Sequence, residues 1–163
     1  MSDSVPDRGV RSPRSRANDP YRIEDLADFL EGTWQFERKV HDALLDQEGD
    51  CIGVAQFYAD ASNLNYREEG ELTMGEIQTS TERDYIYMFP APSMAEVRFS
   101  DGRLFHLLDL TKGIVRVEHK CVDDIYHGLF RVLGPDAWLS VWRIIGPRKS
   151  QVITTRYLRA IPS

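Results

Sequence analysis

The sequence has 163 residues, 42% of them hydrophobic and 28% charged, which is an ordinary balance for one globular domain with its own core. The net charge of -6 argues against a nucleic-acid-binding protein, because neutralising phosphates requires a concentrated basic surface. No run approaches the roughly 18 apolar residues of a membrane helix and no signal-peptide-like stretch opens the sequence, so we expect a cytoplasmic protein without a membrane span.

Residues 1–19 contain arginines among Ser, Pro, Gly and Asp, with few side chains that a core could bury. This composition is typical of disorder. We therefore predict a disordered basic tail over residues 1–19 and a single domain over residues 20–163.

A short amphipathic helix is predicted over residues 21–30. Asp19 is placed to cap it, and Gly32 to end it. The apolar residues that recur at helical spacing are Ile23, Leu26, Ala27 and Leu30.

From residue 33 the apolar residues alternate with polar ones, as in a strand with one buried face. Further strands are predicted over 51–59, 64–74, 77–90, 94–100, 102–110, 113–122, 125–134, 136–146 and 150–160. Turn residues separate them, including Gly49 and Asp50 before the second strand. Regular strands with such short connections predict an all-β fold, a closed antiparallel up-and-down barrel of about 8 to 10 strands, with a β-sandwich as the alternative.

The sequence LeuGluGlyThrTrp at 30–34 resembles the GxW signature that opens the first strand of lipocalin-like (calycin) barrels. This resemblance implies that an arginine on the last strand packs over Trp34, and Arg156 and Arg159 are both candidates. The later half also resembles an uncharacterised bacterial and fungal domain family, in HxCxxDxY at 119–126 and GPRK at 146–149. That second likeness covers residues 26–160 and implies no chemistry.

Strand alternation places several polar side chains on the inner wall of the predicted barrel. The assignment is least clear at His106, because Phe105 and Leu107 make the opposite face of that strand apolar too. The residues expected to line the interior and bind a ligand are Arg38, Tyr66, Glu68, His106, His119, Cys121, Tyr126, Trp142 and Arg156.

Each unpaired buried polar group costs on the order of 1 to 3 kcal/mol, so this polar interior requires partners. One interpretation is an internal network, with Arg38 on Glu68, tyrosine hydroxyls on histidine nitrogens and Arg156 on Trp34. The other is a ligand that completes the hydrogen bonds. We predict a pocket for a small, mostly apolar molecule with an anionic or carbonyl group, oriented by Arg38, His119 and Tyr126. The GPRK turn would place two cations at the rim, where they meet either a carboxylate or solvent.

Other chemistries remain open. His119, Glu68 and Tyr126 are candidates for acid and base catalysis by a cofactor-free isomerase, hydratase or cyclase. Haem would need His106, His119 or His127, although no cofactor is predicted. A metal set of His119, Cys121, His106 and either Asp123 or Asp124 has the right residue types, yet we predict no metal because no spacing motif supports it. Cys51 and Cys121 are expected to be free thiols, and a purely structural partner of another protein is a third class of function.

Overall fold

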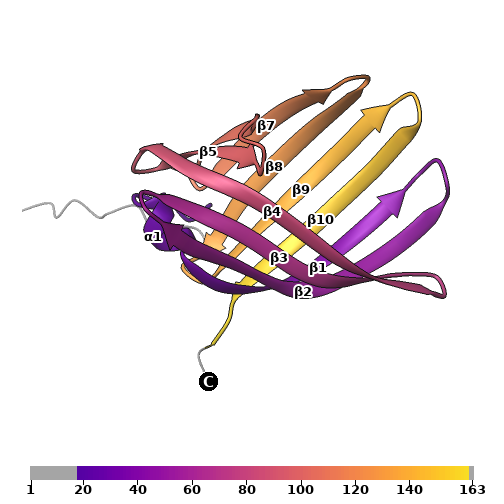
Figure 1. The fold of residues 1–163 in the computed structure, drawn as a ribbon, viewed down its shortest axis with the longest axis horizontal. Coiled ribbons are helices and arrows are strands. Elements are labelled where there is room, and N and C mark those ends of the chain that lie inside the picture. The colour runs from indigo at the N-terminus through magenta and orange to yellow at the C-terminus, as the bar shows by residue number, and fades with distance from the viewer. Residues whose placement is uncertain (1–17, 162–163) are drawn as a thin grey trace, which may run out of the picture.

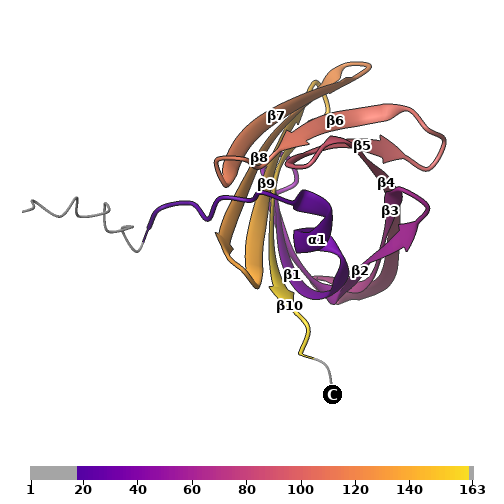
Figure 2. The same cartoon turned by 90° about the vertical axis from the view of Figure 1, so that its left-hand side faces the viewer.

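The structure is a computed structural model that describes residues 18–161. Ten antiparallel strands curl into a nearly closed barrel, with one short helix at the N-terminal side (Figures 1 and 2). The predicted fold class, an all-β up-and-down barrel with a short N-terminal helix, is confirmed. The predicted tail lies outside the described residues except for Asn18 and Asp19, and the division into tail and domain stays a prediction.

Strands adjacent in sequence pair with each other except β6 and β7, and β1 also pairs with β10, the first strand with the last. The strands are β1 (Gly32–Asp42), β2 (Gln47–Asp60), β3 (Asn63–Met74), β4 (Ile77–Ala91), β5 (Met94–Phe99), β6 (Leu104–Asp109), β7 (Ile114–Cys121), β8 (Asp124–Gly134), β9 (Ala137–Gly146) and β10 (Lys149–Arg159). The sheet order runs from β6 round to β7, so these two strands form the seam of the barrel.

The helix α1 (Leu26–Leu30) is shorter than predicted and starts later. Its cap is Asp25 rather than Asp19, and the Asp25 carboxylate accepts a hydrogen bond from the Asp28 N–H at 3.0 Å. The predicted first turn is instead extended, because the N–H groups of Tyr21 and Ile23 donate to carbonyl oxygens of the barrel, at 3.1 and 3.2 Å. The prediction of a helix from residue 21 was therefore wrong, since these long-range backbone bonds replace the helical ones.

One end of the barrel is covered by α1 (Figure 2). Trp34 is fully buried there and its Nε1 donates to the Leu30 carbonyl at 2.8 Å. The Arg159 guanidinium lies 4.3 Å from the Trp34 ring centroid and donates to the Phe29 carbonyl at 2.8 Å. Of the two arginines considered for this position, Arg159 packs over Trp34 and Arg156 does not. This end is packed with protein side chains.

The first hairpin turns at residues 43–46, earlier than the Gly49 and Asp50 turn that we predicted. The Asp42 carboxylate stabilises this turn, because one of its oxygens accepts hydrogen bonds from the N–H groups of Leu44 and Leu45, each at 3.0 Å. Gly49 and Asp50 are therefore paired residues inside β2.

Candidate functional site

A cavity of about 670 Å³ lies in the half of the barrel away from α1. Val122 in the β7–β8 turn and Lys149 at the start of β10 mark its rim. Aromatic and cationic residues dominate its lining, namely Tyr85, Phe99, Phe105, Tyr126, Trp142 and Tyr157 together with Arg38, Arg83, Arg103, Lys120 and Lys149. No aspartate or glutamate among residues 18–161 lines this cavity.

Phe105 is the centre of an aromatic wall on one side of the cavity. Its ring stacks on Phe99, with centroids 4.8 Å apart, and on Trp142, with centroids 5.1 Å apart. His119 approaches the same ring edge-on at 5.1 Å. Phe105 is on β6 and His119 is on β7, so this contact spans the seam of the barrel.

A bulge explains why Phe105 faces the cavity. Val97 pairs with His106 but Arg98 pairs with Leu104, so Phe105 has no partner in the β5–β6 ladder. Both Phe105 and His106 can then face inward. Phe105 was not among the predicted site residues, and the apolar character of both faces of this strand was the one sequence signal that could have indicated it.

His106 lies beneath the cavity and does not line it. It is 5% exposed, and its ring centroid lies 5.2 Å from that of Phe130 and 5.4 Å from that of Trp142. Its Nδ1 is 3.1 Å from the Leu107 carbonyl oxygen. Burial lowers the pKa of His106 to about 4, so the folded protein holds this ring neutral at pH 7.

This pKa makes the stability of the barrel depend on pH. The unfolded chain takes up a proton at His106 near pH 6.5, whereas the folded chain does so only near pH 4. Protonation of His106 in the unfolded chain should therefore lower the free energy of unfolding by about 3 kcal/mol as the pH drops from 6.5 to about 4. Urea unfolding at pH 7 and pH 4.5 should show a smaller loss in His106→Gln than in the wild type. The control is the same substitution at the half-exposed His127. Equal pH dependence in wild type and His106→Gln would contradict the assignment of this pH effect to His106.

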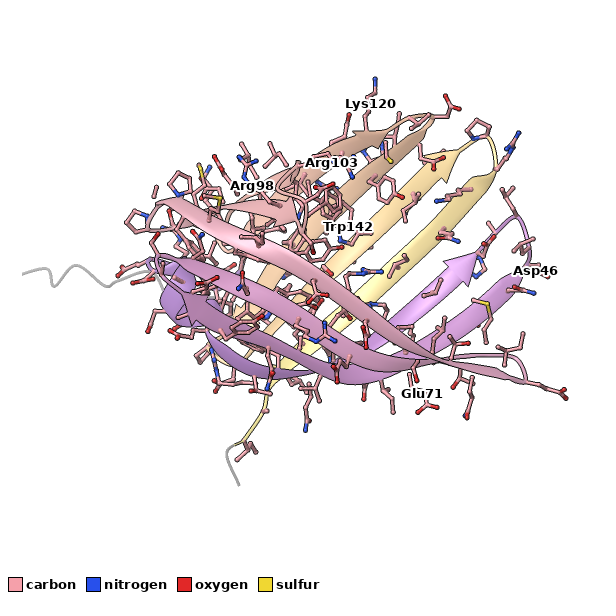
Figure 3. The ribbon with its side chains drawn as sticks, in the orientation of Figure 1. Asp46, Glu71, Arg98, Arg103, Lys120 and Trp142 are labelled. Atoms are coloured by element: carbon pink, nitrogen blue, oxygen red, sulfur yellow. The ribbon has the colours of Figure 1, made fainter. Side chains whose placement is uncertain are left out.

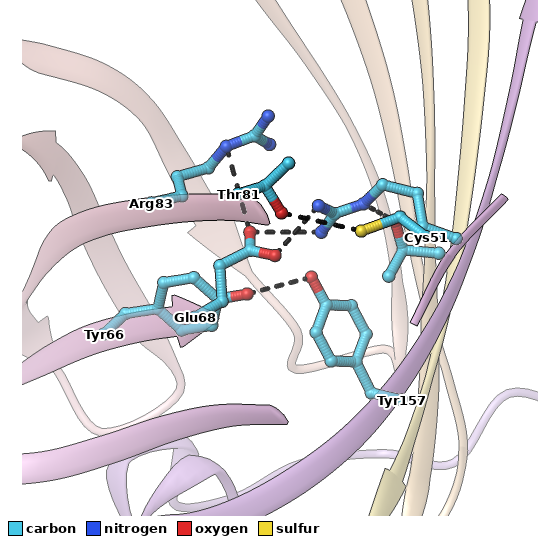
Figure 4. A network of polar contacts seen from close by, with 8 residues as sticks. Cys51, Tyr66, Glu68, Thr81, Arg83 and Tyr157 are labelled. Atoms are coloured by element: carbon cyan, nitrogen blue, oxygen red, sulfur yellow. Dashed lines mark hydrogen bonds and ion pairs between the residues drawn. The ribbon is translucent and has the colours of Figure 1, made fainter. Parts of the chain in front are cut away.

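Arg38 and Glu68 form a buried ion pair, as in the internal-network interpretation of the sequence (Figure 4). Arg38 Nη1 donates to Glu68 Oε2 at 2.8 Å and Nη2 donates to Oε1 at 3.1 Å. Arg38 Nε donates to Thr155 Oγ1 at 2.8 Å. Burial alone would lower the pKa of Arg38, but Tyr157 and Glu68 raise it, so the guanidinium stays charged. Glu68 itself does not line the cavity.

The buried tyrosines Tyr66 and Tyr157 pair with each other, whereas the internal-network interpretation of the sequence placed tyrosine hydroxyls on histidine nitrogens. The hydroxyls of Tyr66 and Tyr157 are 3.2 Å apart, and Tyr157 also lines the cavity. Burial raises the pKa of both phenols, so both hydroxyls stay protonated at neutral pH. Tyr157 therefore presents a neutral phenol to the cavity.

Arg83 on β4 is a second site residue that sequence reasoning missed. Its Nε lies 3.8 Å from Glu68 Oε1, the same oxygen that accepts a hydrogen bond from Arg38 Nη2 (Figure 4). The residues around it, 79–84, are polar on both faces of the strand, so alternation did not indicate which of them face inward.

The structure brings together only part of the predicted set. His119, Tyr126 and Trp142 line the cavity, and Cys121 lines it at the exposed rim. Arg156 does not, because it pairs with the exposed Glu37 while the adjacent Tyr157 pairs with the buried Phe36. Directly paired residues point to the same face of a sheet, so Arg156 is on the outside and its predicted inward position was wrong.

The structure brings no metal site together. Within residues 18–161, no group of three or more His, Cys, Asp or Glu side chains is placed to hold a metal ion. The hypothetical set of His106, His119, Cys121 and either Asp123 or Asp124 is therefore not assembled. Both cysteines are free thiols, as predicted, with Cys51 buried. His127 is on the outer face, 3.5 Å from Glu118. No helix in the described part of the chain has the length and apolar character needed to cross a membrane.

Comparison with known proteins gives a family and a fold. The model of a family described as "Family of unknown function (DUF6314)" matches residues 30–159. No curated protein matches the chain. The structure is similar to the S-type phycobiliprotein lyase CPES from Guillardia theta, with a TM-score of 0.62 and 9% identity over 88% of this chain and 95% of the lyase.

It is also similar to a protein of unknown function from the DUF3598 family of Nostoc punctiforme, with a TM-score of 0.58 and 10% identity. That match covers 86% of this chain but 51% of the other, about half its length. At such low identities the likeness shows a shared fold, and the function has to be argued from the site.

Proposed function

This chain belongs to the DUF6314 family, and we propose that it binds a small, mostly apolar molecule with an anionic or carbonyl group inside its barrel. The observation that carries the proposal is the lining of the cavity, which combines aromatic rings and cations and, within residues 18–161, contains no carboxylate side chain. Aromatic rings bind the apolar body of such a molecule, and cations orient its polar end.

The charge of the cavity is opposite to that of the whole chain. The net charge of the sequence is -6, whereas the charged residues that line the cavity are all cationic. Some of these cations have carboxylate partners outside the lining, such as Asp101 for Arg103 at 2.7 Å and Asp124 for Lys149 at 3.6 Å. A cavity with low-dielectric walls and an excess of positive charge attracts anions.

Filling the cavity tests this proposal. Ile153 lines the cavity, and the next residue, Val152, is on the opposite face of β10. We expect the aromatic probe 1-anilinonaphthalene-8-sulfonate to bind the wild type saturably, with one molecule per chain. Ile153→Trp should abolish this binding by occupying the space, and Val152→Trp should retain it. Probe fluorescence measures both, and equal binding by the two variants would mean that the probe binds elsewhere.

Native mass spectrometry of the purified protein gives an independent test. A retained small molecule, released on unfolding, would support the proposal and identify the ligand. A Soret band in the same sample would instead indicate haem, and His119 is the one of the three candidate histidines that lines the cavity.

Catalysis in the same cavity is a second candidate function. His119 and Tyr126 both line it, with ring centroids 5.9 Å apart, so a proton donor and acceptor lie side by side. Glu68 is no longer a candidate for acid and base catalysis, because both of its carboxylate oxygens accept hydrogen bonds from Arg38. Incubating a co-purified molecule with fresh protein distinguishes the two functions, since chromatography detects even an isomerisation. An unchanged molecule supports binding alone.

A further inference from the structure

We infer that Arg83 is the residue that binds the anionic group of the ligand, and that the ligand is a planar aromatic or conjugated anion such as an aromatic carboxylate. This inference rests on the binding function proposed above and names its ligand class. The sequence analysis assigned Arg38 to this role. The inference assigns the role to Arg83 instead, a residue that the sequence did not indicate.

Arg38 is committed to protein acceptors. All three of its guanidinium nitrogens donate to protein acceptors, two to Glu68 and one to Thr155. Its charge is neutralised by a carboxylate that is 3% exposed. Arg38 therefore holds Glu68 in place and is a positioning residue.

Arg83 is in the opposite situation. Its side chain is 47% exposed, and its single approach to an acid is the 3.8 Å contact of Nε with Glu68. Its two terminal nitrogens donate no hydrogen bond to any residue in the described chain, and they point away from Glu68 (Figure 4). Two guanidinium groups thus share one carboxylate, which leaves a net positive charge at the cavity wall. A terminal guanidinium edge of this kind binds a carboxylate or sulfonate through two parallel hydrogen bonds.

The other cations of the lining are less suitable. Arg103 and Lys149 have carboxylate partners, Asp101 and Asp124. Lys120 lies at the cavity rim next to the β7–β8 turn, and its side chain extends outward from β7 (Figure 3). Arg83 is therefore the cation with free donors on the inner side of the wall.

The flat shape of the ligand follows from what lies beside Arg83. Tyr85 is two residues along β4 on the same face, and its ring centroid is 5.6 Å from that of Phe105. Phe105 in turn stacks on Trp142 with an interplanar angle of 19°. The Tyr85 ring is tilted by 42° against Phe105, so it forms a side wall next to the stacked pair of Phe105 and Trp142. A cation next to such an aromatic wall fits a planar molecule that packs on the rings and directs its anionic group to the cation.

Two probes with the same rings separate charge recognition from apolar binding. The anionic probe is 1-anilinonaphthalene-8-sulfonate, and the neutral probe is N-phenyl-1-naphthylamine, which lacks the sulfonate. We expect the wild type to bind the anionic probe more tightly. Arg83→Gln should weaken the anionic probe about tenfold and change the neutral probe by less than about twofold. Arg83→Lys should lie between the two, because it keeps the charge and loses the fork of donors.

The matched control is Arg156→Gln, which removes the same charge from the outer face of β10 and should leave both affinities unchanged. Circular dichroism confirms that each variant is folded. If Arg83→Gln does not fold, the affinities of Arg83→Lys for the two probes provide the test. Equal affinity of the wild type for both probes, or equal weakening of both by Arg83→Gln, would overturn the role of Arg83 while leaving the barrel a binding protein. Failure of the wild type to bind either probe would overturn the proposed function and this inference together.

Discussion

Replacing Glu68 with leucine should lower the free energy of unfolding by about 4 kcal/mol, whereas replacing Arg38 with methionine should lower it by about 2 kcal/mol. The difference comes from Arg83. Without Glu68, the buried Arg38 keeps a charge with no counter-ion and faces a second cation. Without Arg38, Glu68 still has the Arg83 guanidinium 3.8 Å away, and this half-exposed side chain is free to approach.

A double-mutant cycle tests this asymmetry. The variant that carries both Arg38→Met and Glu68→Leu has no buried charge left from the pair, so it should be more stable than Glu68→Leu alone. Urea unfolding at pH 7 measures all four proteins. As a control, Arg67→Gln removes an arginine from solvent-exposed ion pairs with Glu69, Glu82 and Asp84 and should change the free energy of unfolding by about 1 kcal/mol or less. Equal costs for the two single variants would mean that Arg83 does not support Glu68.

Strand alternation predicted the interior well where one face of a strand is apolar and the other charged. In β1 the buried Trp34, Phe36 and Arg38 alternate with exposed Gln35 and Glu37, and the structure agrees. The ion pair of Arg38 with Glu68 could be predicted for the same reason, because both strands have an unambiguous inner face. A period of two is a local property, so a single strand is enough to reveal it.

The errors occurred where the partner strand decides the outcome. β10 carries polar and apolar residues on both faces, so only its pairing with β1 shows that Arg156 is outside. Phe105 faces inward because of a bulge, which depends on the register of β5 against β6. Residues 21–25 have helical spacing, but their backbone groups bond to distant parts of the barrel. These features are set by long-range pairing, which a single sequence does not display.

Two facing glycines let β2 and β3 approach closely, and Gly53→Ala should therefore be severely destabilising. Gly53 on β2 pairs with Gly70 on β3. A Cβ atom at Gly53 would lie 2.1 Å from the Glu69 carbonyl oxygen and 2.7 Å from the Gly70 Cα. Because both atoms belong to the backbone of the paired strand, the clash can be relieved only by separating β2 from β3.

We expect Gly53→Ala to cost about 4 kcal/mol or more, or to prevent folding. Gly134→Ala is the matched control and should be nearly neutral, because a Cβ atom there meets nothing within 4 Å. Thermal unfolding followed by circular dichroism compares the two. Glycine in a strand allows the close backbone approach that a sharply bent barrel needs, so any folded Gly53→Ala protein should also bind the anilinonaphthalene probe less tightly. Wild-type stability in Gly53→Ala would show that β2 and β3 do not approach this closely.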